Sequence, residues 1–258
     1  MQFVFDIDGT ICFDRFRIDD RIKTVLRNAE TYGHQIAFAS ARSYRDCIDV
    51  LGHELSQKVV IGLNGGLAYK EGELILEKPM SRQAFDLALD YCHQHQLPYF
   101  VDDDFNYAHH LGKFMPFIKS VDPLNLAKRV DPQELKHPIK MVIFFGSQPD
   151  KAVKISHSLA KLNQLDISFH EDEACLYLNP REVTKSSTIQ ELFDHDFVAF
   201  GNDKNDIAMF QAAAYSVQVG DFAALAPFAD TQVKLEKDYH GQVADKITET
   251  FVKFRSNA

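Results

Sequence analysis

The sequence lacks the features that mark membrane-spanning, secreted and disulfide-stabilised proteins. It contains no apolar run of about 18 residues, so we expect no membrane-spanning helix. Its first residues, MQFVFDIDG, include neither a basic segment nor a long apolar stretch, and we expect no signal peptide. The four cysteines form no C-x-x-C pair, which favours reduced thiols in a cytoplasmic protein over a disulfide framework.

Positive charge is also scarce in this chain. Its 28 Lys and Arg residues stand against 37 Asp and Glu residues, which gives a formal net charge of −9. This balance argues against a nucleic-acid backbone or an anionic membrane as the main partner, although a local site can still bind a small anion. The 258 residues are 45% hydrophobic, so the chain can bury a sizeable core in one large domain or two modest ones.

The two ends of the chain alternate between strand-like and helix-like segments. In the N-terminal part we expect strands at 3–5, 35–39 and 58–61, a helix over 19–32, and a second helix that Gly52 ends. Near the C-terminus the pattern resumes with helices at 184–194, 205–213 and 240–254 and strands at 197–200 and 215–219. Such alternation predicts parallel strands joined by crossover helices.

The segment between these ends has a different texture. After a hairpin at 69–77, we expect helices at 81–96 and 150–163 and strands at 99–103, 106–110, 139–145, 166–170 and 174–178. This α+β segment of about one hundred residues is large enough to fold by itself. We therefore predict an α/β fold. Residues 1–80 and 182–258 would form a doubly wound parallel-sheet core, and residues 81–181 an inserted α+β domain.

Two carboxylates follow the first predicted strand, in the motif DIDGT. Asp6 and Asp8 repel each other at this spacing unless something cationic holds them, most simply a hard divalent metal. The carboxyl edge of a parallel sheet is also where open α/β folds bind ligands. The structural alternative is a capped turn with solvated carboxylates.

Three further signals fall at other strand ends or helix starts: Ser40 with Arg42, Lys185, and the loop GNDKND at 201–206. In a doubly wound sheet these loops meet the first motif at one edge. Together they supply a nucleophile, a proton carrier, a hydroxyl donor, a lysine and a metal-binding loop, as phosphoryl transfer through an aspartyl-phosphate requires. Each has an alternative as a helix cap, a surface residue or a turn.

The order of these motifs resembles the haloacid dehalogenase (HAD) superfamily of phosphohydrolases. Within it, the chain is similar to the Cof-type branch, in which a large C2-type cap interrupts a Rossmann-like core. DIDGT is highly specific, and ASARS, VTKSSTIQEL and GNDKNDIAMF follow in the family's order, with LNGG near residue 64. The resemblance implies a Mg²⁺-dependent phosphatase, a phosphoric monoester hydrolase, acting on a small phosphorylated metabolite such as a sugar phosphate. No protein partner is evident.

The resemblance also implies roles for individual residues. Asp6 would attack phosphorus, Asp8 would act as general acid and then base, and Lys185 would offset the charge between Asp6 and phosphate. The phosphate- and substrate-binding residues would be Gly9, Thr10, Ser40, Ala41, Arg42, Asn64 and Asn205. The Mg²⁺ ligands would be Asp6, Asp8 through its carbonyl, Asn202 and Asp206, with Asp203 as an alternative ligand.

Asn202 is the one departure from the family pattern. Similar proteins usually carry GDxxND, in which the first aspartate binds the metal directly. A neutral amide oxygen can still bind Mg²⁺, but the site loses one negative charge. One alternative function therefore stays open, a phospho-ligand-binding or regulatory protein with weak turnover. A separate alternative is a phosphotransferase or mutase, in which a sugar hydroxyl replaces water.

Overall fold

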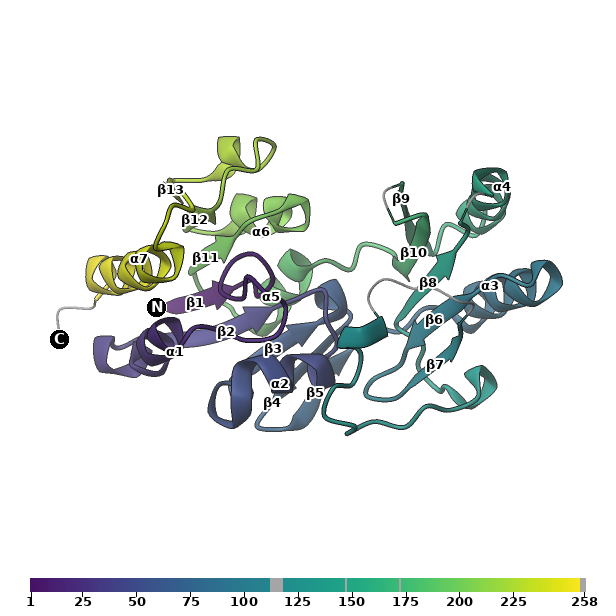
Figure 1. Ribbon diagram of the computed structural model, residues 1–258, viewed down its shortest axis with the longest axis horizontal. Coiled ribbons are helices and arrows are strands. Elements are labelled where there is room, and N and C mark those ends of the chain that lie inside the picture. Colours follow the sequence, from purple (N-terminus) through teal and green to yellow (C-terminus); the bar gives the residue numbers. More distant parts are fainter. Residues whose placement is uncertain (112–117, 147, 172, 256–258) are drawn as a thin grey trace. The chain divides into compact units, whose positions relative to one another are not determined.

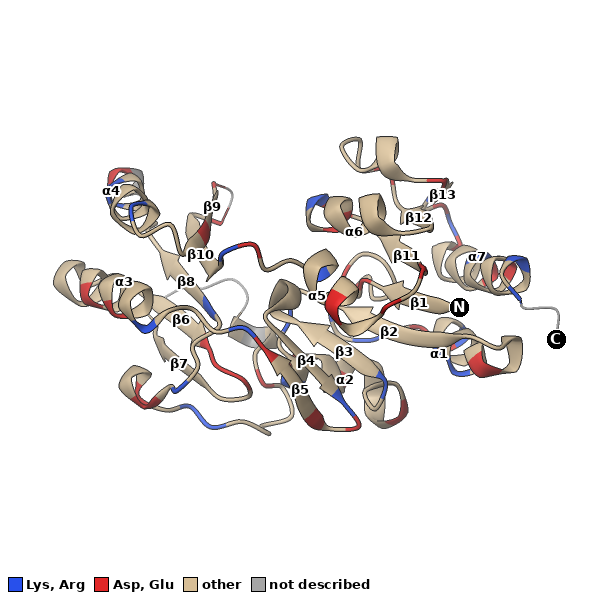
Figure 2. Cartoon of the chain, turned by 180° about the vertical axis from the view of Figure 1, so that it is seen from behind, with Lys and Arg blue, Asp and Glu red and all other residues tan. Residues whose placement is uncertain are grey.

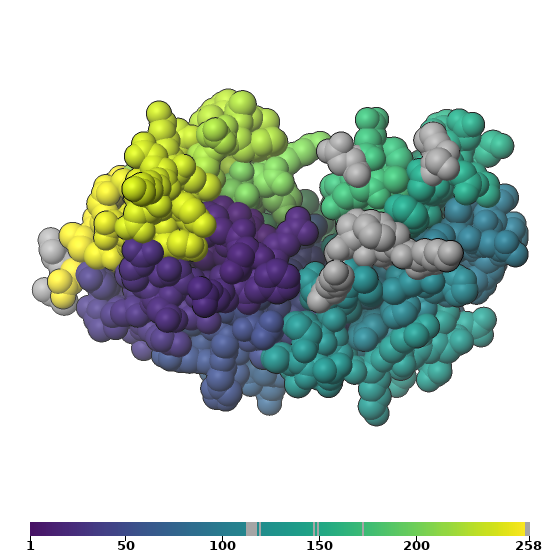
Figure 3. Space-filling model, in the orientation of Figure 1, coloured from purple at the N-terminus to yellow at the C-terminus, as the bar shows by residue number. Residues whose placement is uncertain are grey.

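The computed structural model describes residues 1–111, 118–146, 148–171 and 173–255 (Figure 1). The chain divides into two compact units, one formed by Met1–Ile75 with Thr184–Ala258 and the other by Leu76–Val183. The first unit is thus built from both ends of the chain. Figure 3 shows the purple N-terminal segment packed against the yellow C-terminal segment within that unit.

An eight-stranded sheet organises the first unit, in the order β13-β12-β11-β1-β2-β3-β4-β5. Neighbours from β13 to β3 are parallel, whereas β4 runs antiparallel to β3. The strands are β1 (Gln2–Phe5), β2 (Gln35–Ala39), β3 (Val59–Gly62), β4 (Leu67–Lys70), β5 (Glu73–Glu77), β11 (Phe197–Gly201), β12 (Tyr215–Val219) and β13 (Thr231–Val233). The boundary between the two units falls within β5.

The direction in which strands are added changes beside β1. From β1 the chain adds β2 and β3 on one side, and later adds β11, β12 and β13 on the other. The carboxyl ends of β1 and β11 therefore flank the switch point at which doubly wound sheets bind ligands. Phe5 pairs with Phe200, and Asp6 donates its backbone N–H to the Phe200 carbonyl at 2.9 Å. The loops after these two strands must consequently meet.

Helices and buried aromatic rings hold this sheet in place. The helices are α1 (Asp20–Arg27), α2 (Tyr44–Leu55), α5 (Lys185–Leu192), α6 (Ile207–Ala212) and α7 (Tyr239–Lys253). Helices α1 and α7 lie side by side (Figure 1). The ring of Phe5 lies 6.3 Å from that of Phe38 and 4.8 Å from that of Phe200, measured between centroids. Strands β1 and β11 are buried throughout, which explains their continuous apolar character.

The second unit is an antiparallel five-stranded sheet with two helices, in the order β7-β6-β8-β10-β9. Its elements are α3 (Arg82–His95), β6 (Tyr99–Asp102), β7 (Tyr107–His110), β8 (Lys140–Phe144), α4 (Pro149–Ala160), β9 (Leu165–His170) and β10 (Cys175–Pro180). Side chains alternate along β6: Val101 belongs to the core shared with the helices, and Phe100 to a smaller cluster on the opposite face. The predicted fold class, a parallel α/β core interrupted by an α+β unit, is confirmed.

Some local features differ from the expectations. The helix expected over 19–32 is two separate elements. Helix α1 ends at Arg27, and a 3₁₀ turn at Ala29–Tyr32 follows it, which Gly33 closes at φ 78°. Helix α2 passes Gly52, whose φ of 75° interrupts it, and ends at Leu55. Strand β13 was not predicted, because it has only three residues and an exposed glutamine at its centre.

No helix among the described residues is long and apolar enough to cross a membrane. Figure 2 shows Asp and Glu interspersed with Lys and Arg along the helices and loops of both units. The four cysteines are buried, and each is a free thiol.

Candidate active site

Asp6 is buried directly after β1, at the switch point of the sheet. Its Oδ1 accepts a hydrogen bond from Lys185 Nζ at 2.6 Å. Its Oδ2 accepts one from Thr10 Oγ1 at 2.8 Å. One residue of the same loop and one residue 179 positions away in the chain therefore fix this carboxylate.

Lys185, the first residue of α5, is a fully enclosed cation between two carboxylates. Its Nζ donates to Asp6 Oδ1 at 2.6 Å and to Asp206 Oδ1 at 2.8 Å. The Thr184 side chain caps α5, which sets where Lys185 leaves the helix. Gly65, at φ 106°, packs so closely on Thr184 that an added Cβ would lie 2.2 Å from its carbonyl oxygen. The LNGG loop and the start of α5 are thereby held together.

Burial governs the ionisation of this cluster. Desolvation raises the pKa of Asp6 to about 7, against the lowering effect of Lys185, while the Asp206 carboxylate also raises it. Burial alone would lower the pKa of Lys185, but the carboxylates of Asp206 and Asp6 outweigh it and raise that pKa. One buried cation thus faces two buried carboxylates, and a second positive charge would complete their neutralisation.

The GNDKND loop after β11 is both a helix cap and a wall of the site. Asp206 is fully buried, and its Oδ2 accepts the backbone N–H groups of Asn202 at 2.9 Å and Asp203 at 3.1 Å. Both Asp206 oxygens are therefore engaged, one by the loop and one by the buried lysine. Asp203 is exposed and caps the next turn. At Gly201 an added Cβ would lie 2.7 Å from the Asp206 carboxylate, so only glycine fits.

The Asn202 side chain lies opposite Asp6. The end of its carboxamide that faces the site is 3.0 Å from Asp6 Oδ2, 3.0 Å from the Asp8 carbonyl oxygen and 3.2 Å from Thr10 Oγ1. All three neighbours are oxygens. The Thr10 hydroxyl can donate to an amide oxygen there, whereas Asp6 Oδ2 and the Asp8 carbonyl oxygen need either the amide nitrogen as a donor or a cation that they share with the amide oxygen. The other end of the amide lies over Gly9, at φ 80°, where an added Cβ would be 2.2 Å from Nδ2.

These oxygen positions fit a magnesium ion. Mg–O distances of about 2.0–2.1 Å place neighbouring octahedral ligands about 2.8–3.0 Å apart. The amide of Asn202 stands 3.0 Å from both Asp6 Oδ2 and the Asp8 carbonyl oxygen. Within the described residues, no group of three or more His, Cys, Asp or Glu side chains could hold a metal. The two findings agree, because only one of these three ligands is a carboxylate.

The Asp8 carboxylate is held by Arg42. Arg42 Nε donates to Asp8 Oδ2 at 2.8 Å and Nη2 to Oδ1 at 2.6 Å, a bidentate pair, while Nη2 also donates to the Arg15 carbonyl at 2.7 Å. Burial alone would lower the pKa of Arg42, but the Asp8 hydrogen bonds and charge raise it. The pair connects the first motif with the loop after β2. Sequence reasoning placed both residues at one sheet edge but left the role of Arg42 open.

The remaining predicted phosphate-binding residues belong to neighbouring loops. Ser40 is buried after β2, where its Oγ accepts the Arg42 N–H at 3.1 Å and its carbonyl accepts the Asn64 N–H at 2.9 Å. Asn64 Oδ1 accepts Asn205 Nδ2 at 3.2 Å, which ties the LNGG loop to the GNDKND loop. Ala41 lies between Ser40 and Arg42 in the chain. Each loop that carries predicted residues therefore contacts at least one of the others.

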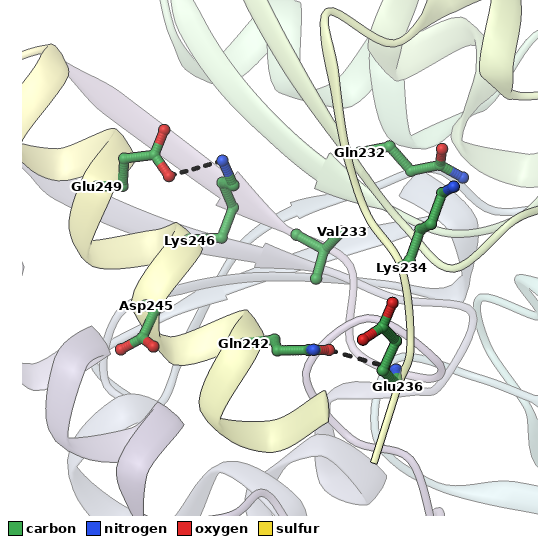
Figure 4. Close-up of a pocket in the computed structure, with 8 residues that line it drawn as sticks. All are labelled: Gln232, Val233, Lys234, Glu236, Gln242, Asp245, Lys246 and Glu249. Atoms are coloured by element: carbon green, nitrogen blue, oxygen red, sulfur yellow. Dashed lines mark hydrogen bonds and ion pairs between the residues drawn. The ribbon is translucent and has the colours of Figure 1, made fainter. Parts of the chain in front are cut away.

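A separate pocket of about 370 Å³ lies between β13 and α7 (Figure 4). Its lining is Gln232, Val233, Lys234, Glu236, Gln242, Asp245, Lys246 and Glu249. Lys246 pairs with Glu249 at 2.6 Å, and the Glu236 N–H donates to Gln242 Oε1 at 3.3 Å. None of the predicted site residues lines it, so this pocket is separate from the site at the switch point.

A sequence profile of haloacid dehalogenase-like hydrolases matches residues 3–243. The chain belongs to this family. Two curated relatives, both named HMP-PP phosphatase, are 23% identical to it. The protein from Enterobacter sp. (strain 638) aligns over 229 residues, covering 84% of this chain and 83% of the relative. The protein from Yersinia enterocolitica aligns over 242 residues, covering 84% and 82%.

Solved structures of this superfamily share the fold. A haloacid dehalogenase-like hydrolase from Bacteroides thetaiotaomicron has a TM-score of 0.80 at 18% identity, covering 96% of this chain and 98% of that one. A sugar phosphatase of HAD subclass IIB has a TM-score of 0.73 at 19% identity, covering 97% and 99%. The predicted family is confirmed, and its phosphatase members support the assignment as a phosphoric monoester hydrolase.

Proposed function

We propose that this protein is a cytoplasmic, Mg²⁺-dependent phosphatase that hydrolyses a small phosphorylated metabolite through an aspartyl-phosphate on Asp6. The observation that carries the proposal is the meeting of three distant segments at the switch point. Lys185 Nζ lies 2.6 Å from one Asp6 oxygen and the Asn202 amide 3.0 Å from the other. A carboxylate held between a lysine and a cation-binding set is suited to accept a phosphoryl group.

The first half-reaction exchanges one bond at phosphorus. An Asp6 oxygen bonds to phosphorus while the bond from phosphorus to the leaving-group oxygen breaks, and Asp8 gives that oxygen its proton. Lys185 balances the charge that the phosphate brings to Asp6. Bound Mg²⁺, held by Asp6, the Asp8 carbonyl and Asn202, would supply further charge stabilisation at the phosphate.

The second half-reaction releases phosphate. Asp8 takes a proton from a water molecule that attacks phosphorus, the bond to Asp6 breaks, and the Asp6 carboxylate is restored. Both Asp8 oxygens accept hydrogen bonds from Arg42, which therefore competes for the atoms that must exchange the proton. The planar guanidinium binds phosphate as well as carboxylate, so transfer of Arg42 to the substrate would free Asp8 for its role.

The neighbouring loops define what the site can bind. Ser40 and the backbone at Ala41 would contact the transferred phosphoryl group, and Asn64 with Asn205 the part of the substrate next to it. Relatives are named HMP-PP phosphatase and sugar phosphatase, which supports small phosphorylated metabolites, sugar phosphates included, as the substrate class. In this proposal the inserted unit, predicted at residues 81–181, acts as a cap that selects among them.

The test is release of phosphate from p-nitrophenyl phosphate with and without Mg²⁺. We expect Mg²⁺-dependent turnover that Asp6→Asn lowers by at least about a thousandfold, because the nucleophile is gone. Asp245→Asn, which removes a carboxylate from the pocket beside α7, serves as the matched control and should leave turnover unchanged. Full activity in Asp6→Asn would refute the aspartyl-phosphate.

Asn202 supports one competing function. Its neutral side chain lowers the charge of the metal site, which would suit a protein that binds a phosphorylated ligand without turning it over. Binding of a phosphorylated metabolite by the wild type, without turnover at any Mg²⁺ concentration, would favour that function.

A further inference from the structure

The Asn202 amide stands where three oxygens of the site converge. Its inward end is 3.0 Å from Asp6 Oδ2, 3.0 Å from the Asp8 carbonyl oxygen and 3.2 Å from Thr10 Oγ1. A carboxamide carries a donor at one end and an acceptor at the other, and half a turn about its last torsion exchanges the two. An ionised aspartate at this position offers acceptors at both ends, so it can accept from the Thr10 hydroxyl but has no orientation that satisfies Asp6 Oδ2 and the Asp8 carbonyl oxygen without a cation.

We propose that Asn202 is a reversible metal ligand whose carboxamide rotates by half a turn about its last torsion when a divalent cation binds or leaves. With the cation present, Oδ1 faces it together with Asp6 Oδ2 and the Asp8 carbonyl oxygen. Without the cation, Nδ2 faces inward and donates to the same two oxygens, with Thr10 Oγ1 as a third contact. This inference rests on the proposed Mg²⁺ site and adds to it how the metal-free protein keeps that site intact.

The surroundings of the amide support this exchange. Gly9 leaves room beside the amide, because an added Cβ there would lie 2.2 Å from Nδ2 and 2.9 Å from Cγ. The backbone of Asn202 does not need to move, since its N–H is fixed to Asp206 Oδ2 at 2.9 Å. Only the outer torsion of one side chain separates the two states, and such torsions are soft.

Two consequences follow for the metal. Asn202 brings no charge to the cation and must break its inward hydrogen bonds before it can bind, so affinity is lower than an aspartate would give. The metal-free site stays hydrogen-bonded, so loss of the cation costs the fold little. Occupancy of the site therefore follows the free Mg²⁺ concentration, and the protein survives in both states.

The first test measures Mn²⁺ binding through the electron paramagnetic resonance signal of free Mn²⁺. We expect Asn202→Asp to bind at least about tenfold more tightly than the wild type, because the ligand gains a charge. Asn205→Asp adds the same charge in the same loop, at a side chain that contacts Asn64, and should stay within about threefold of the wild type. Equal effects of the two substitutions would overturn the proposal.

Thermal unfolding gives a readout that does not involve activity. In EDTA, Asn202→Asp should melt several degrees below the wild type, because a new carboxylate then stands beside Asp6 Oδ2 and the Asp8 carbonyl oxygen with no cation between them. Mg²⁺ should restore its melting temperature and change that of the wild type little. A metal-free Asn202→Asp variant as stable as the wild type would contradict the role of the inward amide.

The rotation of the Asn202 carboxamide can be followed by nitrogen-15 NMR of the Mg²⁺-bound protein and the metal-free protein. The Asn202 side-chain NH₂ pair is assigned by its disappearance in Asn202→Asp, and it should shift when Mg²⁺ is added. An unshifted pair in a wild-type protein that binds Mn²⁺ would overturn this inference and leave the proposed function standing. Absence of Mn²⁺ binding in every variant would instead defeat the metal site, and the proposed function with it.

Discussion

Asp6 and Asp8 are two residues apart in the chain, and each belongs to a charge cluster of the first unit. The two clusters differ in how far they are exposed to water. Lys185 joins Asp6 and Asp206 with all three side chains at most 6% exposed, whereas Arg42 and Asp8 are 12% and 38% exposed. Water cannot screen or replace the first set of contacts, but water or a phosphate can compete for the second. The comparison indicates that Asp6, the proposed phosphoryl acceptor, is held fixed, while Asp8, the proposed proton carrier, is held by a contact that a ligand can take over.

The largest effect should come from removing the cation of the buried cluster. Lys185→Met leaves Asp6 and Asp206 facing each other without water, so we expect a loss of about 3–5 kcal/mol in the free energy of unfolding. Urea denaturation at neutral pH measures it. The matched control is Lys246→Met, which breaks an exposed pair with Glu249 and should cost less than about 1 kcal/mol. Similar losses in the two variants would erase the contrast between the clusters.

A smaller effect should follow when the buried cluster is displaced without losing a charge. In Gly201→Ala the new Cβ would stand 2.7 Å from the Asp206 carboxylate, which must then shift from Lys185, so we expect a loss of about 2 kcal/mol. Gly72→Ala serves as the control. Its glycine has φ 81° with nothing within 4 Å of an added Cβ, and it should cost about 1 kcal/mol. Urea denaturation should give a larger loss in the free energy of unfolding for Gly201→Ala than for Gly72→Ala. The reverse order would show that the Asp206 carboxylate can shift without destabilising the fold.

Sequence reasoning located the loops of the site but not all of its contacts. The rule that parallel strands place their carboxyl ends at one edge predicted that Asp6 and Asn202 meet, because it needs only strand order. It could not predict that one Asp206 oxygen accepts hydrogen bonds from the backbone of its own loop while the other accepts one from Lys185. Helix caps and metal sites use the same acidic residues, so the amino-acid sequence does not distinguish a capping aspartate from a metal-binding one.

The same limit applies to Arg42. Its position after β2 predicted a side chain near the site, yet a surface residue and a substrate contact have the same sequence pattern. Only the structure shows that Arg42 pairs with Asp8, 34 residues away in the chain, and that its Nη2 also donates to the Arg15 carbonyl. A pair between two loops depends on how those loops are packed, which neither periodicity nor a motif specifies.

The smallest change in stability should come from the partly exposed pair of Arg42 and Asp8. Arg42→Lys keeps the charge but loses the planar fork, so we expect less than about 1 kcal/mol in the free energy of unfolding. Turnover should respond more strongly, because the proposed transfer of the guanidinium from Asp8 to phosphate needs two parallel donors. We expect kcat/KM for p-nitrophenyl phosphate to fall by about tenfold to a hundredfold.

The exposed Arg21, which donates to Asp238 Oδ1 at 3.0 Å, supplies the matched control for that substitution. Arg21→Lys should leave both stability and kcat/KM unchanged, because its pair lies on the surface. The division between KM and kcat then separates two uses of Arg42. A rise in KM alone would mean that the fork binds phosphate equally in the ground and transition states, whereas a fall in kcat would mean that Asp8 is no longer released in time for proton transfer. Unaltered kinetics in Arg42→Lys would show that a point charge beside Asp8 is enough, and the contrast between a fixed acceptor and a releasable proton carrier would no longer hold.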